Sequence, residues 1–145
     1  DNGAVIKLND EIVKIIDNVH TGAMTHERGS IIDMQADMLR ARRRMLWNGS
    51  VTASLVLNRT GNICMVPTIS QTGLGEGEKA DDYIAAASLA VEDAVEQLGK
   101  SARKNDASVE EVAGQAVRRV ARSMFGLRPI THVHIMRVNQ EDLMA

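Results

Sequence analysis

Two histidines near the end of the chain, His132 and His134, stand two residues apart in an apolar, β-branched segment. Side chains at this spacing on a strand point to the same face of a sheet, so the two imidazoles could share a metal ion. A catalytic zinc needs about three protein ligands and one open position for water. The remaining histidines, His20 and His26, lie far away in a polar segment. We therefore interpret the pair as amphipathic side chains on an open sheet face, where they could contact a second subunit.

The densest positive patch of the sequence is a run of arginines in the segment LRARRRMLW. Its members are Arg40, Arg42, Arg43 and Arg44. Guanidinium groups form paired hydrogen bonds with phosphate oxygens, so this patch is the candidate for contact with a phosphate-bearing ligand. The alternative is a solvated helix face, because Asp37 stands three residues before Arg40 and could pair with it.

Other reactive residue types have simpler interpretations. Arg118, Arg119 and Arg122 form a second basic face that is typical of the solvent side of an amphipathic helix, with RNA contact as the alternative. A lone cysteine without a histidine and an acid at a recognisable spacing, as at Cys64, is typical of a small buried hydrophobe. The glycine-rich segment 73–79 (GLGEGEK) is not followed by the Lys-Ser/Thr pair of a phosphate-binding loop, which favours a flexible connection.

Composition limits the classes of protein. The chain has 145 residues and a formal net charge of -2, so RNA contact would need a local patch, not an overall basic surface. Aromatic residues make up 2%, and a core must therefore consist of aliphatic residues and some of the eight methionines. A single cysteine excludes an internal disulfide framework and favours the reducing cytoplasm. No apolar run reaches about 18 residues, so we expect no membrane span.

The first third of the chain predicts a hairpin, a linker and a short helix. Segments 4–8 and 11–16 are β-branched and are separated by a turn at Asn9 and Asp10. An isolated hairpin is marginally stable in water, so we expect it to belong to a neighbouring sheet. Segment 18–31 is polar and aperiodic, as in a linker, and 33–47 predicts a helix that ends at Asn48 and Gly49. The absence of a starting methionine and of a signal peptide suggests a piece of a longer protein.

The remainder predicts an α+β domain. Strands are expected at 51–57, 63–69 and 130–138, and helices at 81–98 and from a capping box at Ser108 and Glu111 to Gly126. Pro67 cannot donate a backbone hydrogen bond to a neighbouring strand, so it predicts either an edge strand or the end of the pairing. The fold class is therefore a small three-stranded sheet with two helices packed on one face, preceded by a β-hairpin and a linker.

Three segments in this order, NGAVIKL, LRARRRMLWNGSVTASLVLN and FGLRPITHVHIMRV, make the chain similar to the C-terminal region of bacterial ribonuclease J. That resemblance implies a parent enzyme of the metallo-β-lactamase superfamily, in the branch with a β-CASP insertion. Such enzymes are zinc-dependent 5′-to-3′ exonucleases and endonucleases that act on RNA. Their metal motif is H-x-H-x-D-H, but Met136 and Arg137 stand here where Asp and His would be needed. The family's ligands precede the stretch that resembles residues 1–17.

The resemblance also implies a division of the chain. Residues 1–17 would be the last strands of a β-lactamase-type domain, 18–47 a linker with a short Arg-rich helix, 48–138 the C-terminal α+β domain, and 139–145 a tail. No cofactor is expected in this chain, and zinc is expected in the catalytic domain of the parent.

The function expected from these features is an assembly and support domain without its own active site. It would self-associate into the dimer or tetramer of the parent and meet RNA through the parent. One rival is an RNA-binding module that uses the Arg40–Arg44 run, although Trp47, Tyr83 and Phe125 do not gather on one strand for base stacking. Another rival is a small-molecule regulatory domain with its site at segment 73–79.

Overall fold

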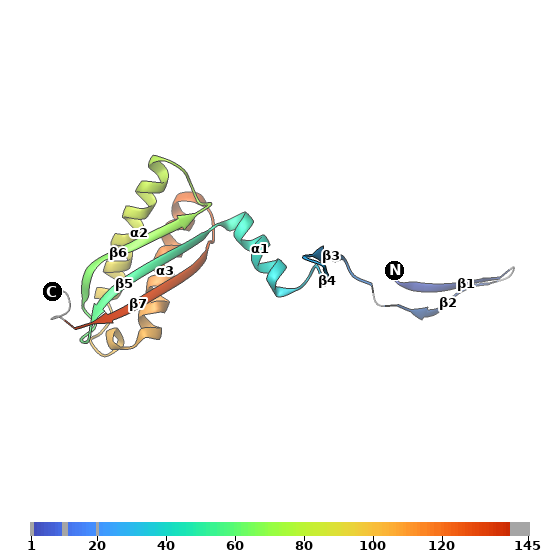
Figure 1. The fold of residues 1–145 in the computed structure, drawn as a ribbon, viewed down its shortest axis with the longest axis horizontal. Helices are drawn as coiled ribbons and strands as arrows, with labels where there is room; N and C mark the ends of the chain where they lie inside the picture. Colours follow the sequence, from blue (N-terminus) through green and yellow to red (C-terminus); the bar gives the residue numbers. More distant parts are fainter. Residues whose placement is uncertain (1, 10–11, 20, 140–145) are drawn as a thin grey trace. The chain divides into compact units, whose positions relative to one another are not determined.

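The computed structural model describes residues 2–9, 12–19 and 21–139, shown as a ribbon in Figure 1. They fall into two compact units, residues 1–42 and 43–145. In the first unit, β1 (Ala4–Asn9) pairs antiparallel with β2 (Ile12–Asn18), and Asn9 lies opposite Ile12. This confirms the predicted hairpin, although the turn residue Asp10 lies outside the described residues. Apolar side chains of the hairpin are exposed, Leu8 by 72% and Val13 by 70%.

A second hairpin overlaps the segment 18–31, which was predicted to be an aperiodic linker. Strands β3 (Met24–Glu27) and β4 (Ser30–Asp33) pair antiparallel around Arg28 and Gly29, whose φ angles are 46° and 85°. Two positive φ angles are the signature of a type I′ turn, whose twist suits a hairpin. This hairpin was not predicted, because arginine stands where asparagine or aspartate usually marks such a turn.

Helix α1 (Asp37–Asn48) begins four residues later than predicted. Asp33 belongs to β4, and its carboxylate Oδ1 accepts a hydrogen bond of 2.7 Å from the backbone N–H of Gln35. The predicted end is confirmed, because Gly49 follows the helix with a φ of 69°. A Cβ at Gly49 would lie 2.6 Å from Leu74 and from the carbonyl oxygen of Thr72, so only glycine fits this approach.

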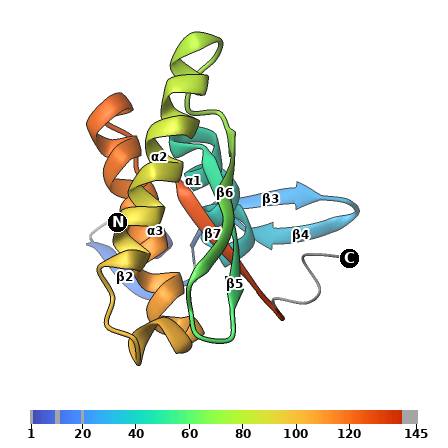
Figure 2. The same cartoon turned by 90° about the vertical axis from the view of Figure 1, so that its left-hand side faces the viewer.

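The second unit has the predicted α+β architecture. Its sheet has the order β6-β5-β7, with β5 (Ser50–Asn58) in the centre. Strand β6 (Ile63–Thr72) is antiparallel to β5, and β7 (Ile130–Val138) is parallel to it. Figures 1 and 2 show helices α2 (Glu78–Glu96) and α3 (Asp106–Phe125) on one face of this sheet. A short 3₁₀ helix, η1 (Ala102–Lys104), connects the two helices.

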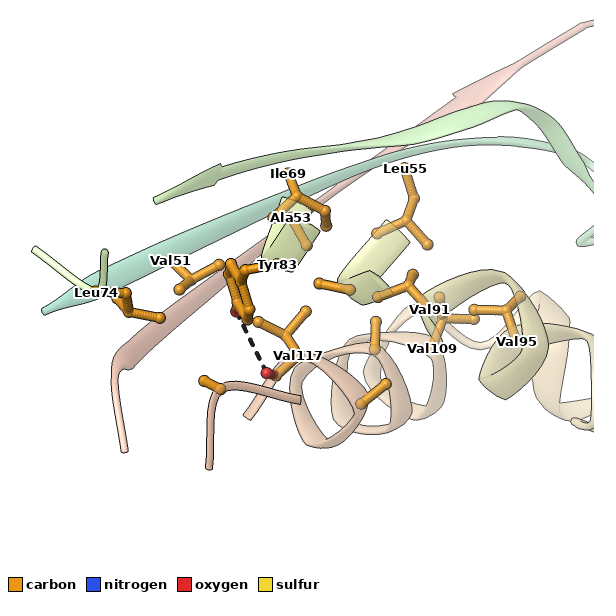
Figure 3. Packing of buried hydrophobic residues seen from close by; sticks show 14 of the residues in the cluster. Val51, Ala53, Leu55, Ile69, Leu74, Tyr83, Val91, Val95, Val109 and Val117 are labelled. Atoms are coloured by element: carbon orange, nitrogen blue, oxygen red, sulfur yellow. Dashed lines mark hydrogen bonds between the residues drawn. The ribbon is translucent and has the colours of Figure 1, made fainter. Parts of the chain in front are cut away.

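One hydrophobic core joins the helices to the covered face of the sheet (Figure 3). Its strand members include the predicted alternating residues Val51, Ala53, Leu55 and Leu57, each at most 1% exposed. The single tyrosine, Tyr83 on α2, is fully buried and was not predicted to be in the core. Its hydroxyl donates a hydrogen bond of 3.3 Å to the carbonyl oxygen of Val117, so its polar end is satisfied on α3.

The start of α3 differs from the predicted capping box. The N-cap is Asn105, whose side-chain oxygen accepts hydrogen bonds from the backbone N–H groups of Ala107 and Ser108. Ser108 therefore lies inside the helix. Asparagine is among the best N-cap residues, and its position three residues earlier satisfies the same kind of orphan donors. At the other end, Gly126 closes the helix in the left-handed conformation, as predicted.

Candidate interaction surfaces

The two histidines of β7 lie on the face of the sheet that the helices leave uncovered. In the register, His132 pairs with Thr52 of β5, which in turn pairs with Ser70 of β6. The next row along the strands continues the pattern with three more polar residues. These are His134, Ser54 and Thr68. Both histidines are exposed, so the structure places them where the open-face interpretation expected them.

A third row on the same face is apolar. Met136 pairs with Val56, and Val56 pairs with Met65. Met136 is 50% exposed and Met65 is 56% exposed. Across the three rows, none of the nine residues is Asp, Glu, Lys or Arg. We refer to these nine residues as the open face.

The open face does not complete a metal site. Within residues 2–9, 12–19 and 21–139, His, Cys, Asp and Glu side chains form no group of three that could hold a metal ion. The position after Met136 is taken by Arg137, whose guanidinium is bonded internally to Asp106. The described residues therefore do not fit a catalytic zinc, whose bound water requires three protein ligands around the metal.

Helix α1 carries the run of arginines that was the candidate for RNA contact. Two of its members form ion pairs: Arg40 with Asp37, and Arg42 with Glu27 at 2.9 Å. The backbone carbonyl of Arg44 accepts a hydrogen bond from Asn48. Because carboxylates already occupy the guanidinium groups of Arg40 and Arg42, these two would have to exchange partners to bind a phosphate.

A second group of arginines gathers around a shallow pocket of about 550 Å³. We call it the arginine pocket, and its lining consists of Gln115, Arg118, Arg119, Arg122, Ser123 and Arg128. The sequence pattern favours a solvent face for the three helical arginines. The presence of Arg128 beside them, beyond the end of α3, was not predicted. The signal that could have indicated it is the short distance in sequence between Arg128 and Gly126, where the helix ends.

The glycine-rich loop before α2 is held by internal contacts. The side-chain amide of Gln71 accepts from the backbone N–H of Leu74 and donates to the carbonyl of Gly75, each at 3.0 Å. Leu74 is buried, and a Cβ at Gly75 would lie 2.9 Å from the ring of Phe125. The glycines therefore permit close packing here. Cys64 is half-buried, and its thiol faces the carbonyl of Asn62 at 3.7 Å.

Comparisons with known proteins point to one family. A model of the ribonuclease J C-terminal domain family matches residues 37–138. A ribonuclease J of Sinorhizobium meliloti is 28% identical over 141 residues. The alignment covers 94% of this chain and 24% of the relative, so the chain spans about a quarter of that protein's length. Among the described helices, none is long and apolar enough to cross a membrane.

Proposed function

Because the chain belongs to the ribonuclease J C-terminal domain family, we propose that it is the assembly and support domain of a ribonuclease J-like protein. Under this proposal, hydrolysis of RNA phosphodiesters, as exonuclease and endonuclease, is the task of a zinc-dependent catalytic domain. The residues described here would hold subunits together in the cytoplasm. The relative's name supports the RNA-cleaving parent.

The open face carries the proposal. A twofold dimer brings the same surface of both subunits into contact. Each residue of that surface therefore lies opposite the same residue, or one of its neighbours, in the second subunit. A face with charged residues would place like charges opposite one another, or would bury a charge without a partner. The nine residues of the open face contain no carboxylate, lysine or arginine. A second copy of the chain can therefore cover this face without that cost.

The chemistry of the polar rows also suits self-association. Serine and threonine hydroxyls and neutral imidazoles each both donate and accept hydrogen bonds, so two identical rows can satisfy each other. The exposed methionines Met65 and Met136 would supply an adaptable apolar patch at one end of the contact. Depletion of charge together with methionine is also the composition that distinguishes the centre of protein interfaces from the rest of a surface.

The hairpin of the first unit supports the connection to a parent protein. Leu8, Val13 and Ile15 are each more than half exposed, so the hairpin buries little apolar surface within residues 1–42. A two-stranded hairpin with exposed aliphatic side chains is unstable alone and favours addition to a larger sheet. We assign residues 1–17 to the sheet of the β-lactamase-type domain of the same protein.

The test of assembly is the solution mass of the full chain by light scattering on a sizing column, over a range of concentrations. We expect a dimer or larger species that persists on dilution. His134→Glu should shift the equilibrium toward monomer by at least about tenfold, because a twofold contact brings two new carboxylates together in a desolvated surface. Ala86→Glu adds the same charge to an exposed position of α2 and should leave the mass unchanged.

A monomer at every concentration would overturn the proposal that this chain drives assembly. So would an equal effect of His134→Glu and Ala86→Glu on the mass. Circular dichroism of both variants checks that each keeps its fold. We expect His134→Glu to remain folded, because His134 is exposed on an edge strand and its replacement removes no core contact.

A further inference from the structure

The arginine pocket is a feature that the assembly role does not use. Arg118, Arg119 and Arg122 come from the last turns of α3, and Arg128 comes from the segment that follows. Residues three and four apart share one side of a helix, so Arg118 and Arg119 are each neighbours of Arg122. The left-handed turn at Gly126 reverses the chain and brings Arg128 to the same hollow.

The backbone fixes the position of Arg128. Its N–H donates a hydrogen bond of 3.3 Å to Oδ1 of Asn48, and the next residue, Pro129, is buried. This segment leads directly into β7, whose first residue Ile130 donates its backbone N–H to the carbonyl of Gly49. The fourth arginine therefore stands on an anchored segment and not on a mobile loop.

Charge in the pocket is uncompensated. No carboxylate lines it, and none of its four arginines forms an ion pair with any described residue. The nearby Glu111 accepts a hydrogen bond of 3.1 Å from Gln115 and not from an arginine. Arg118 is the partial exception, since it also borders a hollow that Glu110 and Glu111 line. Guanidinium groups gathered around a hollow that no acid lines repel one another, which favours an anionic ligand between them.

We propose that the arginine pocket binds the phosphodiester backbone of RNA, outside any active site. Every cation in it is arginine, whose planar fork binds phosphate through two hydrogen bonds, whereas lysine acts as a point charge. Gln115 and Ser123 add neutral groups of the kind that contact phosphate and sugar oxygens. No aromatic residue lines the pocket, so it offers no platform for stacking bases. The contact is therefore independent of base sequence.

The choice of RNA over an acidic protein rests on charge density and on the proposed function. Arg118 and Arg122 are separated by one helical turn, about 6 Å along the axis. Such closely spaced cations match a ligand with one negative charge on every residue of its backbone, as in a nucleic acid. The family assignment supplies a parent that acts on RNA.

The test measures binding of a fluorescently labelled oligouridylate to the full chain by anisotropy at several salt concentrations. Arg119→Gln combined with Arg122→Gln should weaken binding by at least about tenfold, because each removes charge-assisted hydrogen bonds. The slope of log affinity against log salt should fall by roughly 0.7 for each arginine that contacts a phosphate. Arg122→Lys keeps the positive charge but removes the paired hydrogen-bond donors of the guanidinium group. It should give an intermediate affinity and leave the slope of log affinity against log salt unchanged.

Two matched double variants serve as controls. Arg59→Gln with Lys100→Gln removes the same charge from exposed positions elsewhere in residues 43–145 and should leave affinity within about twofold. Arg43→Gln with Arg44→Gln tests the arginine run on α1 as the alternative RNA contact. This variant should also reduce the affinity for RNA by less than the pocket variant does. Equal losses in the pocket variant and in either control would overturn the proposal, as would an absence of binding by the unaltered chain.

A competitor separates RNA from an acidic protein surface. Polyglutamate should displace the oligouridylate much less effectively than unlabelled RNA at equal charge, and equal displacement would overturn the phosphodiester assignment. Light scattering of the same samples keeps this proposal distinct from the assembly role. A pocket variant that loses RNA binding with unchanged mass supports the pocket, and a monomeric chain that still binds RNA through the pocket would contradict only the assembly proposal.

Discussion

At the scale of single residues, Arg137 shows how one side chain can secure a sheet edge. Its guanidinium donates to Oδ1 of Asp106 at 2.7 and 3.0 Å, to the carbonyl of Asn58 at 3.1 Å and to the carbonyl of Arg103 at 2.8 Å. These contacts join β7 to the end of β5 and to the start of α3. The position at which the resemblance's metal motif would need a histidine is thus occupied by a structural arginine.

Tyr83 provides a residue-scale prediction about pH. Burial raises the pKa of its hydroxyl from 10.0 to about 12. Between these values the unfolded chain loses a proton that the folded chain keeps, so the free energy of unfolding falls as the pH rises. We expect this stabilising difference to be intact below pH 10 and to decrease by roughly 3 kcal/mol toward pH 12. Denaturant unfolding at a series of pH values measures it.

Tyr83→Phe is the control, because it removes the titrating hydroxyl and keeps the ring that packs edge-on against Phe125. The variant should lose about 1 kcal/mol at neutral pH through the hydrogen bond to Val117. Above pH 10 it should decline less steeply than the unaltered chain. The chain has a single tyrosine, so tyrosinate absorbance reports this residue alone. Parallel declines in stability for both proteins would contradict the assignment.

At the scale of elements, the start of α3 depends on Asn105. Asn105→Ala should lower the free energy of unfolding by about 1 kcal/mol, because it leaves the N–H groups of Ala107 and Ser108 without their side-chain acceptor. Ser108→Ala should change stability by less than about 0.5 kcal/mol, since Ser108 lies inside the helix. Thermal unfolding measures the stability of the two variants. A larger loss of stability for Ser108→Ala than for Asn105→Ala would support Ser108 as the N-cap, as the capping box predicted.

Sequence patterns predicted those elements whose signals are local. The alternation from Val51 to Leu57 predicted β5, and Gly126 predicted the end of α3, because each pattern directly reflects burial or a positive φ. The hairpin β3–β4 was not predicted, since its turn uses the uncommon pair Arg28-Gly29. The capping box was misplaced because both Asn105 and Ser108 are suitable residues, and only packing decides between them.

At the scale of the whole molecule, the candidate surfaces depend on tertiary register. The sequence showed that His132 and His134 share a face, but not that Thr52 and Ser54 lie beside them, because β5 and β7 are far apart in the chain. The arginine pocket likewise requires the chain reversal that brings Arg128 to α3. Neither arrangement follows from local periodicity.

The division into two units leads to a whole-molecule prediction. All buried members of the hydrophobic core, from Val51 to Ala121, belong to residues 43–145. A protein restricted to residues 43–145 should therefore unfold in one cooperative transition, with a midpoint within a few degrees of that of the full chain. Circular dichroism during heating measures it. Loss of cooperativity would show that residues 1–42 supply stability that the core does not reveal.

The parallel pairing of β5 with β7 has a consequence for biosynthesis. Val51 lies beside Thr131 in the sheet, so the central strand lacks one neighbour until nearly the whole unit has left the ribosome. Only the β5–β6 hairpin and the two helices can associate earlier, and long-range strand pairing is slow. During that interval the edge of β5 exposes unpaired backbone groups, which can pair with another nascent chain. This domain is therefore expected to complete its sheet only after β7 has left the ribosome, and to depend on protection of the β5 edge until then.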